Sequence, residues 1–131
     1  MSARAFATVL GVAFLLAGIV GFVPSPPPLT APPLTVEHGH GLALGLFPVN
    51  ILHNVVHLLF GVLGLMAGRS AGAARGYAKF VAVAYALLTV LGLIPATQTA
   101  FGLIPIYGND VWLHGAIAAA AAYFGFVRGG D

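Results

Sequence analysis

The fold is decided by the run AFATVLGVAFLLAGIVGFV, residues 5–23, which carries no charged side chain. A helix that crosses the hydrocarbon core of a bilayer needs about 17 to 25 such residues. Three further runs have the same character, at residues 51–67, 77–94 and 111–127. Lys79 is the only Lys or Arg inside these runs, and it lies near a helix end where its stem can reach the headgroups. The sequence therefore predicts four membrane-spanning helices.

The composition of the whole chain supports this interpretation. The 131 residues are 60% hydrophobic and only 6% charged, whereas soluble domains average about 25% charged residues. Too few charges are present to cover a soluble globule, and five Lys and Arg residues are too few to bind nucleic acid. The chain has no Cys, which excludes disulfides and thiolate metal sites. We expect one all-α domain over residues 1–131, an up-down bundle of four transmembrane helices.

The distribution of cations predicts the orientation in the membrane. Lys and Arg occur only before the first run, around the loop between the second and third, and after the fourth; they are Arg4, Arg69, Arg75, Lys79 and Arg128. Cytoplasmic loops carry the excess of Lys and Arg, so both termini should be cytoplasmic. The first run also resembles a secretory signal, but it is longer than a typical signal core and no A-x-A-like cleavage site follows, so we expect it to be retained.

The long outer loop, residues 24–50, is rich in proline and contains the runs PSPPP and APP. Proline excludes helix and central strand here, which leaves either an extended arm lying on the membrane or on a neighbour, or a simple linker. Its last part, residues 41–47, is apolar enough to lie in the membrane interface. Pro48 is expected in the first turn of the second helix, where a missing N–H costs nothing.

Four ionisable residues inside the spans carry the functional signal: His53, His57, Asp110 and His114. Such groups are costly in a bilayer and point to function. Each pair has a spacing of four residues, so each shares one face of its helix. The second and fourth helices should run parallel and enter from the outer side, which brings the four side chains to a similar depth. Imidazole and carboxylate suit a zinc-like divalent metal, with Asn54 as a supporting partner.

Other interpretations of these residues remain open at this stage. Asn109 or Asp110 could cap the fourth helix, which would not exclude metal binding. The histidines could join helices by hydrogen bonds, or ligate haem or a chlorophyll-type pigment, or form a proton relay. A weaker cluster in the outer loop, Glu37, His38 and His40, could bind metal loosely. No nucleophile elbow, phosphate loop or dinucleotide fingerprint is present, so we predict no catalytic residue.

Small residues recur at spacing four in the apolar runs, as in Ala13 and Ala17 or Gly64 and Gly68. Such faces let helices approach closely in lipid. The small size of the chain and its apolar arm also suit an accessory subunit of a larger respiratory or photosynthetic complex. The expected partners are therefore the bilayer and either other membrane subunits or further copies of this chain.

Several segments resemble the bacterial four-span membrane family of domain of unknown function 4383. They are Arg4 to Phe6, GVAFLLAGIVGFVP at 11–24, NILHNVVHLLFGVLGL at 50–65 and NDVWLH at 109–114. The resemblance covers most of the chain except the proline-rich arm, which is longer than expected. It implies a four-helix membrane protein with both ends inside and brings no activity with it. The expected location is a bacterial inner, or photosynthetic, membrane.

Overall fold

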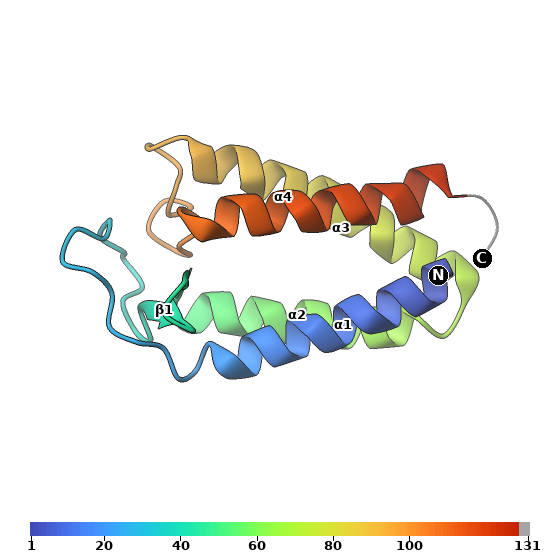
Figure 1. Cartoon of the computed structure of the whole chain (residues 1–131), viewed down its shortest axis with the longest axis horizontal. Coiled ribbons are helices and arrows are strands. Elements are labelled where there is room, and N and C mark those ends of the chain that lie inside the picture. Colours follow the sequence, from blue (N-terminus) through green and yellow to red (C-terminus); the bar gives the residue numbers. More distant parts are fainter. Residues whose placement is uncertain (129–131) are drawn as a thin grey trace.

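The computed structural model describes residues 1–128, and within them the chain forms an up-down bundle of four helices (Figure 1). The helices are α1 (Ala3–Val20), α2 (Ile51–Ala67), α3 (Ala71–Leu93) and α4 (Asn109–Ala122), which continues as the π-helix η1 (Tyr123–Val127). Three helical stretches, α1, α3 and α4 with η1, are long and apolar enough to cross a membrane, and α2 is a shorter apolar helix of 17 residues. The expected all-α, multi-pass membrane fold is confirmed.

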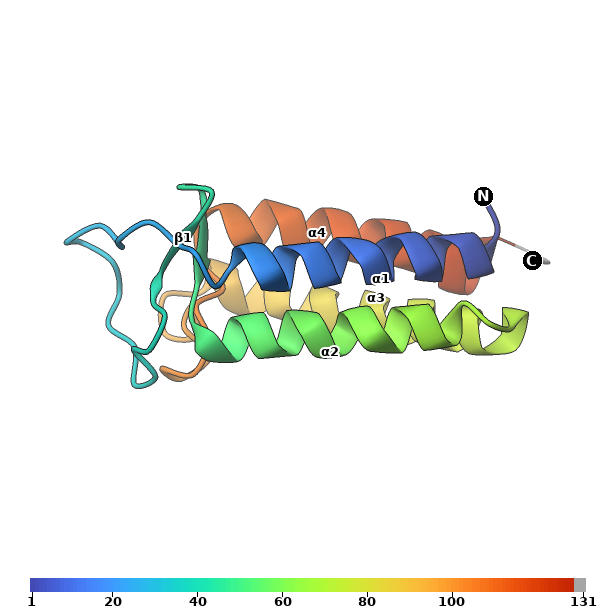
Figure 2. The same ribbon diagram turned by 90° about the horizontal axis from the view of Figure 1, so that it is seen from below.

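The bundle consists of two helical hairpins, α1 with α2 and α3 with α4, as two perpendicular views show (Figures 1 and 2). Within the first hairpin the helices touch through glycine. A Cβ atom on Gly11 would lie 2.8 Å from the carbonyl oxygen of Gly61. The two hairpins meet through a core of small and aromatic side chains that includes Phe14, Tyr77 and Tyr85. Because lipid gives no hydrophobic driving force between helices, this close approach supplies the packing.

The two ends of the bundle differ in chemistry. One end, called here the terminal end, holds the N-terminus, the α2–α3 turn and Arg128; it carries all five Lys and Arg side chains. There the Arg4 Nε donates to the carbonyl oxygen of Gly68 at 3.2 Å, and the Arg75 guanidinium donates to the carbonyl of Arg128. The opposite end, called the loop end, holds the two long loops and no Lys or Arg.

Two helix bounds differ from those expected. The first helix ends at Val20 rather than at residue 23, and the third begins at Ala71 rather than at residue 77. Hydropathy alone placed the start of the third run after Arg75. The structure begins the helix earlier because the Ser70 side chain accepts a hydrogen bond from the backbone N–H of Ala73 and caps it.

The end of the proline-rich arm folds as a short antiparallel hairpin of β1 (Gly41–Ala43) and β2 (Phe47–Val49). The expectation that Pro48 lies in the first turn of α2 is wrong. Pro48 lies in β2 opposite Leu42, and α2 begins at Ile51 after Asn50. Asn50 is the better start because its side chain accepts from the backbone N–H of His53, and proline is tolerated in an edge strand.

The part of the arm just before the β-hairpin bonds to the second long loop. The backbone N–H groups of Thr35 and Val36 both donate to the carbonyl oxygen of Gly102, at 2.8 and 3.0 Å. The Asn50 amide donates to the carbonyl oxygens of Val36 and Leu103, at 3.0 and 2.8 Å. These bonds tie the start of α2 to both loops and fix the loop end around the histidines below it.

Candidate metal centre

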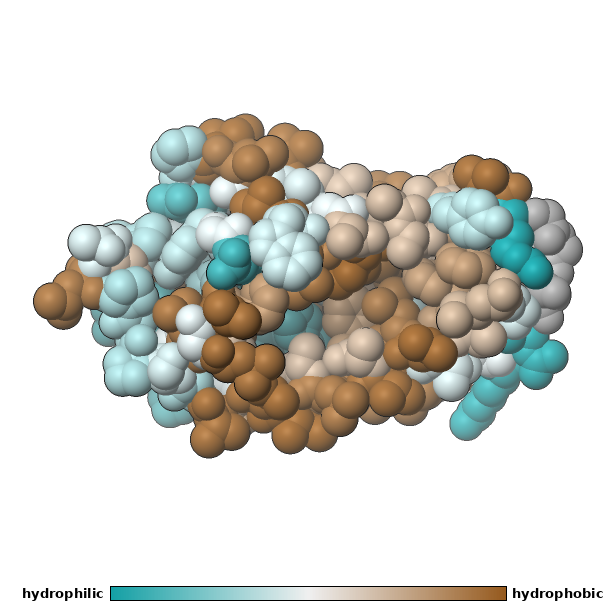
Figure 3. Space-filling model, in the orientation of Figure 1, coloured by the Kyte–Doolittle hydropathy of each residue, from teal (hydrophilic) through white to brown (hydrophobic). Residues whose placement is uncertain are grey.

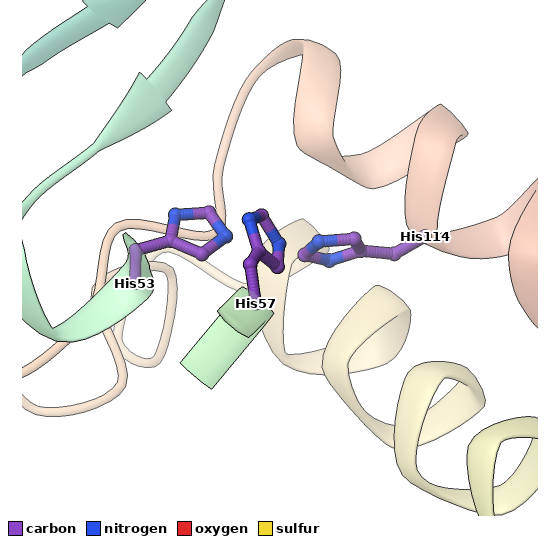
Figure 4. Close-up of side chains that lie close together, drawn as sticks. All are labelled: His53, His57 and His114. Carbon is purple, nitrogen blue, oxygen red and sulfur yellow. The ribbon is translucent and has the colours of Figure 1, made fainter. Parts of the chain in front are cut away.

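Helices α2 and α4 bring three histidines together near the loop end. The Asn50 cap starts α2, so His53 falls in its first turn and His57 follows one turn later on the same face. His114 comes from α4, which runs parallel to α2 (Figure 1). One ring nitrogen from each of the three lies within 4.8 Å of the others, and the rings point toward a common space (Figure 4).

The ring of His53 is oriented by the β-hairpin. Its Nδ1 lies 3.0 Å from the carbonyl oxygen of Pro48 in β2. A carbonyl oxygen can only accept, so Nδ1 carries the proton in this hydrogen bond. In the neutral ring the lone pair then lies on Nε2, which is the arrangement found in metal-ligating histidines whose other nitrogen donates to a backbone carbonyl.

Aromatic rings enclose the three imidazoles. The His53 and His57 ring centroids are 4.3 Å apart, and those of His53 and His114 are 6.1 Å apart. Tyr85 of α3 meets His114 edge-on at 5.0 Å, and Phe14 of α1 stacks on His57 at 5.7 Å. All four helices therefore contribute to the cluster. Neither Phe14 nor Tyr85 stands out in the sequence, because aromatic residues are common in the middle of membrane spans.

Several polar atoms of the cluster are buried without a hydrogen-bond partner among residues 1–128. They are the Nδ1 atoms of His57 and His114 and Oδ2 of Asp110. Leaving such a group unpaired costs about 1 to 3 kcal/mol, more when the group is charged. A cation or a hydrogen-bond donor bound where the three rings and the carboxylate meet would satisfy these atoms.

Asp110 lies beside the three histidines rather than within their group. It is 2% exposed, and its Oδ2 is 3.7 Å from the Nε2 of His53. The expectation that Asn109 or Asp110 caps α4 is wrong. Gly108 occupies the capping position with φ +67°, a backbone conformation that favours glycine, and no side chain of the described residues caps the helix.

Asn109 instead connects α4 to the β-hairpin. Its amide donates to the carbonyl oxygen of Leu46 at 2.9 Å, and its Oδ1 accepts from the indole N–H of Trp112 at 3.1 Å. Because the Asp110 carboxylate does not cap α4, it can lie inside the bundle, where the residue is buried. Asn54, expected as a supporting partner, packs against Gly21, the residue that follows α1, where an added Cβ would lie 1.8 Å from the Asn54 Oδ1.

Comparison with known proteins places the chain in a family. The family model of domain of unknown function DUF4383 matches residues 4–127, which covers the bundle from α1 to the end of η1. The chain belongs to the DUF4383 family. No curated protein and no solved structure matches it.

In this DUF4383 protein the second, weaker cluster does not assemble as a ligand group. His38 is exposed, and its carbonyl oxygen accepts from the N–H of Ile51. The His40 N–H donates to the carbonyl oxygen of Glu37. Burial lowers the pKa of His40, and the nearby Glu37 charge acts in the opposite direction. Across residues 1–128, Glu37, His38 and His40 do not bring three ligand atoms together as the membrane histidines do.

An apolar pocket of about 260 Å³ adjoins His53 and His57. It lies between α1 and α4 under the β-hairpin, and His53, His57 and Asp110 line its inner side. Figure 3 shows this face of the DUF4383 protein hollowed near the loop end, with hydrophilic surface inside the hollow and hydrophobic surface around it. A second cavity of about 110 Å³ lies on the α3 side of the cluster, lined by His53, His114 and Tyr85 among others.

Proposed function

We propose that this DUF4383 protein binds one zinc-like divalent metal ion through His53, His57 and His114, with Asp110 beside them. The observation that carries the proposal is the approach of three ligand nitrogens to within 4.8 Å of one another in the interior of a membrane bundle. Neutral imidazoles with a nearby carboxylate are ligands that zinc and other first-row divalent ions accept.

The dimensions of the cluster suit a small ion. Tetrahedral zinc with bonds of about 2.0 to 2.1 Å separates its nitrogen ligands by about 3.3 Å. The three nitrogens therefore need to close by at most about 1.5 Å, which rotation of the rings about their side-chain bonds can supply. Three protein ligands leave one coordination position for Asp110, 3.7 Å from His53, or for a molecule from outside the chain.

The same distances favour a bare ion over haem or a pigment. A macrocycle bound between two axial histidines needs a flat space between the two imidazoles. That space must be as thick as the macrocycle and as wide as its whole ring. The His53 and His57 rings lie 4.3 Å apart and are tilted by 50°, so they do not face each other across such a space. Tyr85 closes the far side of His114.

A bound ion would join the two hairpins of the bundle. His53 and His57 belong to α2 of the first hairpin, and His114 belongs to α4 of the second. We further propose that the protein lies in a bacterial inner membrane with both termini in the cytoplasm, because all five Lys and Arg side chains lie at the terminal end. The metal would then lie near the extracytoplasmic surface.

Metal analysis of the purified protein tests this proposal. The detergent-solubilised protein is stripped with a chelator, titrated with zinc, and its bound metal counted by elemental analysis after gel filtration. We expect one zinc per chain in the wild type and in the control His38→Ala, which removes an exposed loop imidazole. His57→Ala and His114→Gln should each lose stoichiometric binding. A wild type that binds no zinc, or variants that bind it as well as the wild type, would overturn the proposal.

A further inference from the structure

The apolar pocket beside the histidines has the features of a ligand site that opens toward lipid. Its walls come from α1, α4 and the β-hairpin, and Leu16 and Leu44 on those walls are 58% and 72% exposed. Side faces of a membrane bundle near its middle and its interface contact acyl chains rather than water. Trp112, 58% exposed on the first turn of α4, has the amphipathic ring that marks a membrane interface. The pocket therefore opens sideways toward lipid, close to the membrane interface at the loop end.

The inner side of the pocket is polar and lacks partners. Asp110 is 2% exposed, lines the pocket, and its Oδ2 has no hydrogen-bond partner among the residues described. His53 lines the same wall, and its lone pair lies on Nε2 because Nδ1 donates to Pro48. Asp110 Oδ2, 3.7 Å from Nε2 of His53, thus faces an apolar space with no hydrogen-bond donor of the described residues in reach.

We propose that the pocket binds a single-chain amphiphile with a hydroxyl head group, which enters sideways from the bilayer. The hydroxyl donates to Asp110 and the apolar chain lies between α1 and α4 toward the lipid. A hydroxyl is the smallest head that supplies the missing donor without a charge, and a charged head would cost desolvation in this apolar pocket. An engineered cavity of about 150 Å³ holds benzene, so a pocket of about 260 Å³ has room for a head group and the first part of a chain.

The β-hairpin of β1 and β2 closes the pocket toward the outer surface. Leu44 at its tip has φ +56°, a left-handed conformation that a bulky residue rarely adopts. This places a leucine rather than a glycine over the pocket, with Gly45 at φ +71° completing the turn. Ala43 and Phe47 from the two strands line the pocket below it. Entry from the aqueous side is thereby covered by apolar side chains, which leaves the lateral opening between α1 and α4.

The amphiphile needs only the Asp110 carboxyl and the apolar walls, so this inference does not depend on a bound metal at His53. His114 belongs to the proposed metal ligands but does not line the pocket, whereas Asp110 and Ala17 line it. Loss of the metal and loss of the amphiphile can therefore be separated by substitution. Aliphatic alcohols and alkyl hydroquinones share the required chemistry, and the experiment distinguishes them.

Photolabelling in lipid vesicles tests the proposal. The probes are a twelve-carbon alkanol and a dodecyl hydroquinone, each with a diazirine near the head, and the methyl ether of the alkanol, which has no donor. We expect at least one hydroxyl probe to label the peptides around the pocket, with the stronger probe identifying the head group as aliphatic or aromatic. The ether should label them roughly tenfold less, as expected for the loss of one hydrogen bond.

Substitutions complete the test. Asp110→Leu removes the acceptor and Ala17→Phe fills the mouth of the pocket, so each should reduce labelling roughly tenfold or more. Ala13→Phe is the matched control, one turn away on the same helix, also exposed and outside the pocket lining, and should label as the wild type does. His114→Gln should keep labelling while losing zinc. Equal labelling by the ether, no labelling by either hydroxyl probe, or equal loss in Ala13→Phe and Ala17→Phe would overturn the proposal.

Discussion

The carbonyl oxygen of Pro48 lies 3.0 Å from Nδ1 of His53, so the β-hairpin orients the histidine that lines the two cavities next to the cluster. This bond comes from the backbone of an edge strand, and proline at that position is compatible with it because only the carbonyl is used. The register of the hairpin and the position of the His53 ring are therefore coupled. Changes to the outer loop are therefore expected to shift the His53 ring within the cluster.

Asn50 is expected to be the most important polar residue outside the cluster for stability. Its side chain caps α2 and donates to the carbonyl oxygens of Val36 and Leu103. Asn50→Ala removes a helix cap and leaves two carbonyls without this donor, which should lower the free energy of unfolding by about 2 to 3 kcal/mol. The change in the free energy of unfolding is measured by unfolding both proteins in mixed micelles with increasing sodium dodecyl sulfate.

The matched control for this prediction is Ser70→Ala at the start of α3. The Ser70 side chain accepts from the N–H of Ala73 and makes no hydrogen bond to a distant loop within residues 1–128, so its loss should cost only about 1 kcal/mol. Equal losses in the two variants would show that the loop contacts of Asn50 add nothing to its capping.

Glycine at the α1–α2 crossing is expected to be irreplaceable. A Cβ on Gly11 would lie 2.8 Å from the Gly61 carbonyl oxygen and 2.9 Å from the backbone nitrogen of Leu65, and backbone atoms cannot move aside cheaply. Gly11→Ala should separate the helices and destabilise the bundle by about 1 to 3 kcal/mol. Gly76→Ala in α3 meets nothing within 4 Å and should instead stabilise by about 0.4 to 1 kcal/mol. The same micelle unfolding assay compares them, and a neutral Gly11→Ala would contradict the packing argument.

The helical part of the fold could be predicted from the sequence because bilayer thickness sets helix length and leaves few alternatives. The charge-free run at 51–67 coincides with α2, and the run at 5–23 overlaps most of α1. The ends were harder to place. Ser70 starts α3 through a hydrogen bond to its own first turn, a local effect that hydropathy does not report.

The candidate site could be predicted only in part. Spacing of four residues put His53 and His57 on one face, and the parallel direction of α2 and α4 brought His114 to the same depth. The hairpin that orients His53 was not foreseen, because strand pairing in a short loop depends on contacts outside it. Asp110 does not cap α4 because the helix already begins at Asn109, with the left-handed Gly108 at the capping position.

Membrane orientation is expected to follow the cations. The chain contains no Cys, so single cysteines can be introduced without background. Thr30→Cys in the exposed outer arm should react with an impermeant thiol reagent in intact cells. Gly72→Cys near the start of α3, exposed and with nothing within 4 Å of an added Cβ, should react only after the cells are opened. The reverse pattern would contradict a cytoplasmic terminal end.

Metal binding is expected to stabilise the bundle by linking its two hairpins. An ion held by His53 and His57 of α2 and His114 of α4 binds the folded chain, so zinc at about 100 times its Kd should add about 2.7 kcal/mol to the free energy of unfolding. A chelator should reverse the gain, and the effect should vanish in His114→Gln. The distinguishing measurement is the unfolding midpoint with and without zinc for the wild type, His114→Gln and His38→Ala. If the histidines served only as contacts between helices, zinc would leave all three midpoints unchanged and His114→Gln would simply be less stable. A zinc-dependent shift in the wild type and in His38→Ala alone requires the ion to bridge the hairpins through the membrane histidines.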